Sequence, residues 1–248
     1  MKTVLLINKK YTEIQSLQLF LFNKLIDKLK YFNYDYDLIE IEYKSDRYGQ
    51  LPLPGSYFDF KMKQFYHELE KYDNDEIILY IDHFDIFPLT GPEEVLEKFK
   101  SFNADIVFGH EKNCWPMLNN IDKFYPNKDY INCGIYMGIN SKIKKLMDYS
   151  FAIDTIQFYD DQHAWSLMTR LINEGIKTKN DVNSTIALCL HGRDISQYNI
   201  FENRLINSLD NTKPCFIHGN NNSFKEYIED KNKNIINGLL NIEPTKTS

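Results

Sequence analysis

The sequence predicts an α/β fold in which helices cover both faces of a sheet. Short apolar runs alternate along the chain with longer stretches in which apolar residues recur every three or four positions, patterns typical of buried strands and amphipathic helices. One apolar run, residues 77–81, ends abruptly in two carboxylates, Asp82 and Asp85. Because ligands bind at the carboxyl ends of the strands in open α/β sheets, we expect this strand to end at the functional site.

The composition is that of one large globular domain. The chain has 248 residues, and 43% of them are hydrophobic, which is enough to fill a core. We expect a single domain over residues 1–242 and a polar, disordered tail at residues 243–248. The net charge of −6, without a block of lysine and arginine, argues against nucleic acid as a partner, because a nucleic-acid binder must neutralise phosphates.

The start of the chain and its cysteines bear on where the protein acts. The first apolar run, residues 4–7, is far too short for a signal peptide or a membrane span, so we interpret it as the first strand. The four cysteines are widely spaced and form no C-x-x-C pair, which favours reduced thiols over a disulfide framework or a zinc site. The sequence therefore predicts a cytoplasmic protein without a membrane span.

The first half of the chain alternates strands with helices. We predict strands at residues 4–7, 38–41, 77–81 and 104–109. Amphipathic helices are expected between them, near residues 17–29, 62–72 and 92–102. The glycines and prolines of residues 44–58 predict a long loop, and a loop of this length is usually functional. After the fourth strand we expect a loop that holds His110, Glu111, Cys114 and Trp115.

The second half adds three strands and two helices. The strands are predicted at residues 135–139, near 185–190 and at 214–217. A short helix is expected near residues 143–147, and a longer one begins with Asp160 and Asp161 and ends at Gly175. Acidic residues at the start of a helix are usually caps. The last strand ends in His218.

His218 changes the meaning of the two aspartates. Asp82, Asp85 and an imidazole form a mixed oxygen and nitrogen set that suits Mn²⁺ or Mg²⁺ and leaves positions for diphosphate oxygens. Each signal alone is weak, because solvated acids at a strand end and structural histidines are common. The chain has neither a P-loop nor a G-x-G-x-x-G segment, which argues against kinase and dinucleotide sites. Together the three residues indicate a site for an activated nucleotide.

Several motifs, in the same order along the chain, resemble the N-terminal glycosyltransferase domain of the multifunctional procollagen lysyl hydroxylases. The segment 80–85 stands for the family's V-D-S-Y-D, 132–138 for N-S-G-G-F-I-G and 217–220 for V-H-G-N-G. Further matches are at residues 91–96, 114–116 and 160–162. The likeness runs from about residue 3 to residue 222. It implies a GT-A-type fold, with a mixed, mostly parallel sheet and helices on both faces, that uses a nucleotide sugar and a metal.

The resemblance also implies roles for single residues. It implies that Mn²⁺, or Mg²⁺, is bound by Asp82, Asp85 and His218. It implies that the donor nucleotide is held there, with Phe84 stacking on uracil where the family has tyrosine, beside Gly219 and Asn220. The catalytic candidates, which would face the sugar and acceptor, are Trp115, Asn132, Asp160 and Asp161. The bland alternatives are that the tryptophan packs in the core, the asparagine satisfies loop backbone, and one of the two acids only caps a helix.

The sequence departs from the family pattern in the segment that is expected to contact the nucleotide. The family's glycine-rich segment falls on residues 49–60, which hold few glycines, and Gln64 stands where a tryptophan is expected. The contacts could instead come from Tyr57, Phe60, Lys61 or Lys63.

The implied reaction moves glucose from UDP-glucose to galactosylhydroxylysine of collagen-like polypeptides and retains the donor's configuration. Retention is possible through a same-face step or through a covalent intermediate on Asp160 or Asp161. The alternatives are a UDP-galactose-dependent transferase, a different glycan acceptor, or a non-catalytic module that binds a nucleotide sugar or carbohydrate. Family members act in the secretory pathway, whereas the start of this chain predicts the cytoplasm.

Overall fold

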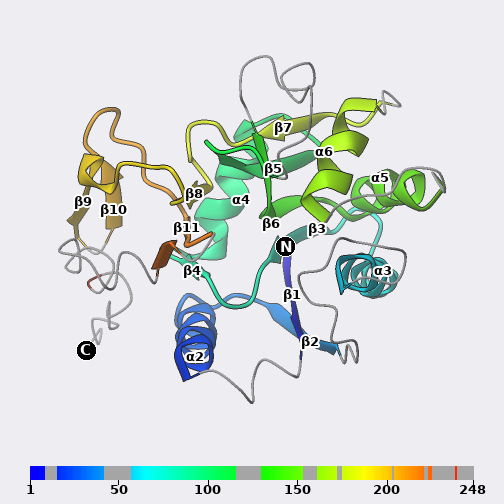
Figure 1. Cartoon of the computed structure of the whole chain (residues 1–248), viewed down its shortest axis with the longest axis horizontal. Coiled ribbons are helices and arrows are strands. Elements are labelled where there is room, and N and C mark those ends of the chain that lie inside the picture. Colours follow the sequence, from blue (N-terminus) through cyan, green and yellow to red (C-terminus); the bar gives the residue numbers. More distant parts are fainter. Residues whose placement is uncertain are drawn as a thin grey trace.

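The computed structural model describes residues 1–8, 16–41, 57–115, 130–152, 161–171, 175–202, 204–220, 223–224 and 238. In this part of the chain a central sheet separates two groups of helices (Figure 1). None of the helices described there is long and apolar enough to cross a membrane.

The central sheet has six strands within the described residues. In chain order they are β1 (Lys2–Asn8), β2 (Tyr36–Ile41), β3 (Ile77–Ile81), β5 (Ile106–Glu111), β6 (Tyr130–Ile139) and β7 (Thr178–Asn180). Their order across the sheet is β2-β1-β3-β6-β5-β7. β1 is parallel to β2 and β3, and β5 is parallel to β7, whereas β6 runs antiparallel to its neighbours β3 and β5. The predicted mixed, mostly parallel sheet is therefore confirmed.

Two smaller sheets lie beside it. β4 (Ile86–Pro88), β8 (Ala187–Cys189) and β11 (Phe216–His218) form one in the order β4-β11-β8. β9 (Tyr198–Phe201) and β10 (Arg204–Asn207) form an antiparallel hairpin that follows the short 3-10 helix η2 (Ile195–Gln197). Because residues 82–85 connect β3 directly to β4, and His218 pairs with Ile86, β11 brings this histidine next to the end of β3.

Helices cover both faces of the central sheet, as predicted (Figure 1). α2 (Ser16–Tyr31) and α4 (Pro92–Ser101) lie on one side, where Leu25 and Val95 belong to one core. α3 (Tyr57–Leu69), α5 (Asn140–Ala152) and α6 (Asp161–Leu171) lie on the other, where Phe65, Met147 and Trp165 belong to a second core. The apolar stripe of each helix is buried against the sheet, which explains the three- and four-residue spacing in the sequence.

The structure corrects several element boundaries. β6 begins five residues before its predicted start at residue 135, because Asn132 and Gly134 interrupt the apolar pattern of a strand that is buried throughout. His110 and Glu111 belong to β5 and not to a loop. α3 begins at Tyr57, inside the predicted loop 44–58, and residues 44–56 lie outside the described residues. The tail at residues 243–248 also lies outside them and stays a prediction.

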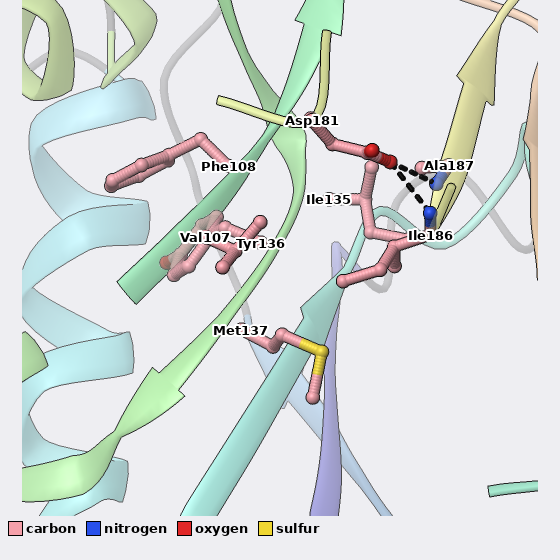
Figure 2. A pocket seen from close by; sticks show the side chains of 9 residues that line it. Val107, Phe108, Ile135, Tyr136, Met137, Asp181, Ile186 and Ala187 are labelled. Carbon is pink, nitrogen blue, oxygen red and sulfur yellow. Dashed lines mark hydrogen bonds between the residues drawn. The ribbon is translucent and has the colours of Figure 1, made fainter. Parts of the chain in front are cut away.

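A buried carboxylate, Asp181, joins the central sheet to the three-stranded one. One oxygen accepts the N–H of Thr185 at 2.7 Å, and the other accepts those of Ile186 and Ala187, both at 2.7 Å. Figure 2 shows the latter two bonds beside a small cavity between the sheets. Burial raises the pKa of Asp181, although the three amides oppose this. The carboxylate fixes the start of β8, whose far end borders the candidate site.

Candidate active site

A cleft of about 760 Å³ opens where β3 and β5 end and β6 begins. Backbone hydrogen bonds fix its rim: Asp82 donates its N–H to the carbonyl of Gly134 at 2.7 Å, and Gly219 donates to the carbonyl of Asp85 at 2.7 Å. Most of the predicted site residues line this cleft, namely Asp82, Asp85, Trp115, Asn132, Asp161, His218 and Asn220. The ends of strands from two different sheets thus meet at one place, as expected for an α/β fold.

Buried His218 and half-buried Asp85 form a close pair in the cleft. The distance from His218 Nε2 to Asp85 Oδ1 is 3.3 Å. Burial would lower the pKa of His218, but Asp85 outweighs it and raises that pKa well above its usual value. Burial would likewise raise the pKa of Asp85, but the histidine outweighs it and lowers that pKa. Without another cation the two groups therefore form an ion pair.

Gly134 keeps open a space between Asp82 and His218. A Cβ at this position would overlap His218 Cε1 and would lie 3.0 Å from both Asp82 Oδ2 and His218 Nε2, so one of these side chains would have to shift. Within the described residues no group of three or more His, Cys, Asp or Glu side chains is already gathered around one metal position. The donor set around the space, two carboxylates and an imidazole, nevertheless has the chemistry of a Mn²⁺ or Mg²⁺ site. The residues present therefore fit such an ion.

The second oxygen of Asp82 is held by Lys61, for which we predicted only a possible nucleotide contact. The Lys61 ammonium lies 2.9 Å from Asp82 Oδ1 and 2.8 Å from Asp161 Oδ2, and only 8% of the residue is exposed. Burial would lower the pKa of Lys61, but Asp161 and Asp82 outweigh it and raise it well above the usual value. The sequence holds one signal for this role, because Lys61 shares the buried face of α3 with Phe65 and Leu69 at four-residue spacing.

Glu111 is the centre of a second polar network, which the sequence did not reveal. Its carboxylate accepts hydrogen bonds from Gln162 Nε2 and, at 2.7 Å, from Asn220 Nδ2, and Asn132 also bonds to it. Burial raises the pKa of Glu111, while these amide groups and His218 oppose the shift. Asn220 in turn accepts the backbone N–H of His191 at 3.0 Å. The network joins the ends of β5, β8 and β11 along one wall of the cleft.

Comparison with known proteins identifies the family. The model of the family described as PLOD GT domain matches residues 15–239. The chain belongs to this family. It is 29% identical over 158 residues to an uncharacterised protein of Acanthamoeba polyphaga mimivirus, an alignment that covers 61% of this chain and 33% of the viral protein. It is 26% identical over 167 residues to the multifunctional procollagen lysine hydroxylase and glycosyltransferase LH3 of Rattus norvegicus, with 62% and 22% of the two chains covered.

The alignments with these curated relatives therefore span a third or less of their lengths. Among solved structures, the chain is similar to a glycosyltransferase involved in the glycosylation of the major capsid of PBCV-1. The TM-score is 0.52 at 12% identity, and the alignment covers 91% of this chain and 95% of that one. This likeness concerns the fold, which is the GT-A fold of glycosyltransferases.

The other candidate site residues of this PLOD GT domain differ in how far they are exposed to the cleft. Trp115 is 64% exposed at the cleft, so the alternative that it packs in the core is wrong. Asn132 Oδ1 accepts the N–H of Gly134 at 3.1 Å, so it satisfies strand backbone while lining the cleft. Phe84 is half-buried, with its ring 3.9 Å from that of His83, and does not line the cleft. Gly219 contributes its backbone N–H only to the rim.

Of the two candidate acids, only Asp161 belongs to the part of the chain that the structure describes. Asp161 is the first residue of α6; one oxygen accepts the N–H of Gln162 at 3.1 Å and the other faces Lys61. It therefore lies in the cleft and at a helix start at once. Asp160 lies outside the described residues.

Proposed function

We propose that this chain is a metal-dependent glycosyltransferase that moves glucose from UDP-glucose to galactosylhydroxylysine of collagen-like polypeptides, with retention of the donor's configuration. One observation carries the proposal: Asp82, Asp85 and His218 line the same cleft as Asp161 and an exposed tryptophan, Trp115. Membership of the PLOD GT domain family and the GT-A fold support a nucleotide-sugar donor.

On the donor side, Asp82, Asp85 and His218 would hold Mn²⁺, or Mg²⁺ in its place. The bound ion supplies positive charge that stabilises the departing UDP. Phe84 is half-buried beside the two aspartates and does not line the cleft, so it would stack on uracil by turning its ring toward the bound nucleotide. Asn220 keeps the wall in place through its bonds to Glu111 and to the backbone of His191.

On the transfer side, Asp161 would stabilise the positive charge that develops at the anomeric carbon. Its neighbour Asp160 shares this candidacy, and either acid would be the nucleophile if the reaction proceeds by double displacement. Trp115 offers an exposed aromatic face on which a sugar ring can stack, and its carbonyl accepts Gln162 Nε2 at 3.0 Å, which anchors the loop. Asn132, which also lines the cleft, would contact the sugar.

The proposed acceptor rests on the names of relatives. The rat relative is a multifunctional procollagen lysine hydroxylase and glycosyltransferase, and the matched part of this chain corresponds to about a fifth of it. We therefore propose collagen-like polypeptides as partners of this domain. The choice of glucose rests on the family resemblance described for the sequence and not on the relative's name.

UDP release by the purified chain tests the proposal. A panel of UDP-sugars is supplied with Mn²⁺, with and without galactosylhydroxylysine peptides, and Asp85→Asn serves as the control. We expect the fastest release with UDP-glucose and peptide together, and little with the variant. Preference for UDP-galactose or for a free glycan would replace the donor or the acceptor in the proposal. Binding of UDP without any turnover would make the chain a non-catalytic module.

A further inference from the structure

Lys61 joins the two halves of the cleft through a single ammonium group. It lies 2.9 Å from Asp82 on the metal side and 2.8 Å from Asp161 on the transfer side. It also lies over the ring of Tyr80, 5.3 Å from the ring centroid. A buried charge between two carboxylates is costly to build and is held in one geometry only when its partners are well placed.

The two oxygens of Asp82 have different surroundings. Oδ1 accepts from Lys61 and, at 2.9 Å, from the hydroxyl of Tyr80. Oδ2 faces the space that Gly134 keeps open, with His218 Nε2 on its other side. The lysine therefore occupies one oxygen of this carboxylate and leaves the other toward the metal side.

We propose that Lys61 is a positioning residue that couples metal binding to Asp161, by sharing one positive charge between Asp82 and Asp161. This inference rests on the proposed function, because it takes Asp82 as a metal ligand. A charge already paired with Asp82 weakens the attraction of that carboxylate for a second cation. Asp161 also pairs with the Lys61 ammonium and so weakens the pairing of that ammonium with Asp82. Asp161 therefore affects the attraction of Asp82 for a metal ion, although Asp161 is not a metal ligand.

The coupling predicts a direction of change in Mn²⁺ affinity that an ion pair with only a structural role would not produce. Replacing Lys61 with methionine keeps a similar apolar stem but removes the charge, so Mn²⁺ should bind more tightly even though a buried interaction is lost. Replacing Asp161 with asparagine leaves Lys61 paired with Asp82 alone, so Mn²⁺ should bind more weakly. If Lys61 only stabilises the fold, its loss lowers the unfolding temperature and leaves metal affinity in the folded protein unchanged.

Titration of the free Mn²⁺ signal by electron paramagnetic resonance tests this, with the chain at fixed pH and ionic strength and no donor present. We expect Lys61→Met to bind Mn²⁺ about tenfold more tightly than the unchanged chain, and Asp161→Asn about tenfold more weakly. Lys63→Met is the matched control, because it removes the same charge from an exposed position two residues further along α3, where water and salt screen it. Its affinity should stay within about twofold.

Asp85→Asn separates this inference from the function on which it rests. If this variant binds Mn²⁺ more weakly but Lys61→Met matches Lys63→Met, the coupling is wrong and the metal site stands. If the unchanged chain binds no Mn²⁺, or Asp85→Asn has no effect, both are wrong. Circular dichroism establishes that each variant is folded. Should Lys61→Met fail to fold, Asp161→Asn still decides, since unchanged Mn²⁺ affinity in that variant overturns the coupling.

Discussion

The carboxylate of Asp181 should be among the most sensitive positions for stability. The residue is 1% exposed, and its oxygens accept three backbone N–H groups, those of Thr185, Ile186 and Ala187. Asp181→Ala removes the acceptor of all three. A buried donor left without a partner costs about 1–3 kcal/mol, so three amount to about 3–9 kcal/mol. Water entering the vacated space should keep the loss of unfolding free energy near the lower end of that range.

Urea unfolding followed by circular dichroism measures this loss. Asp181→Asn keeps one side-chain acceptor and should fall between the unchanged chain and Asp181→Ala. Asp210→Ala is the control, because Asp210 is exposed and its carboxylate accepts the N–H of Thr212, at 2.8 Å, at the protein surface where water can replace the bond. Its loss should stay below about 1 kcal/mol. A loss of unfolding free energy below about 1 kcal/mol for Asp181→Ala would refute the claim that its three hydrogen bonds to backbone N–H groups stabilise the fold.

Four further predictions concern the cleft and the acid stability of the chain. Chelation or Asp85→Ala should abolish turnover of UDP-sugar, and added Mn²⁺ should restore only the chelated protein; near-normal activity of the variant would remove Asp85 from the site. Asp161→Asn should lower transfer at saturating Mn²⁺ by about a hundredfold or more with little change in unfolding temperature, because a charge that acts in the transition state is lost while size is kept; full activity would reduce Asp161 to a helix-terminal residue. Phe84→Ala should weaken UDP binding, measured by calorimetry, by about 1–3 kcal/mol, and unchanged affinity would mean that the ring does not touch the base. Burial would raise the pKa of Glu94, but Arg204 and its neighbours outweigh burial and lower this pKa from 4.5 to about 2. The carboxylate therefore stabilises the fold above about pH 4.5 and loses this effect as the pH falls toward 2. The difference in urea midpoint between the unchanged chain and Glu94→Gln should shrink with acid, and a constant difference would contradict the ion pair.

Much of the fold was predictable because its buried strands are compact apolar runs. Residues 77–81 match β3 at both ends, since the run is bounded by charged residues on each side. β7 was not predicted, because Thr178–Asn180 is a polar strand at the edge of the sheet. The antiparallel direction of β6 was also invisible, since strand direction depends on how the chain returns to the sheet and not on local pattern.

The site was predictable where local motifs carry it. Asp82, Asp85 and His218 reach the same cleft because each stands at the end of a recognisable strand. Lys61 was not assigned its role, because its two partners come from distant segments and a lysine on a helix is usually solvated. Glu111 was placed in a loop because the apolar pattern of β5 stops at Gly109, while the strand continues through polar residues that face the cleft.

Gly134 offers a way to sort family members from their sequences alone. Its missing side chain leaves the room between Asp82 and His218, and a single methyl group there would lie 3.0 Å from both polar atoms. If Asp82 and His218 bind a metal ion as proposed, a larger residue at the equivalent position would have to displace one of these two side chains, whatever acids and histidines the sequence keeps. Such a sequence could retain each expected ligand and still belong to a protein that binds a nucleotide sugar without transferring the sugar. The glycine at position 134 would then predict turnover better than the proposed metal ligands do.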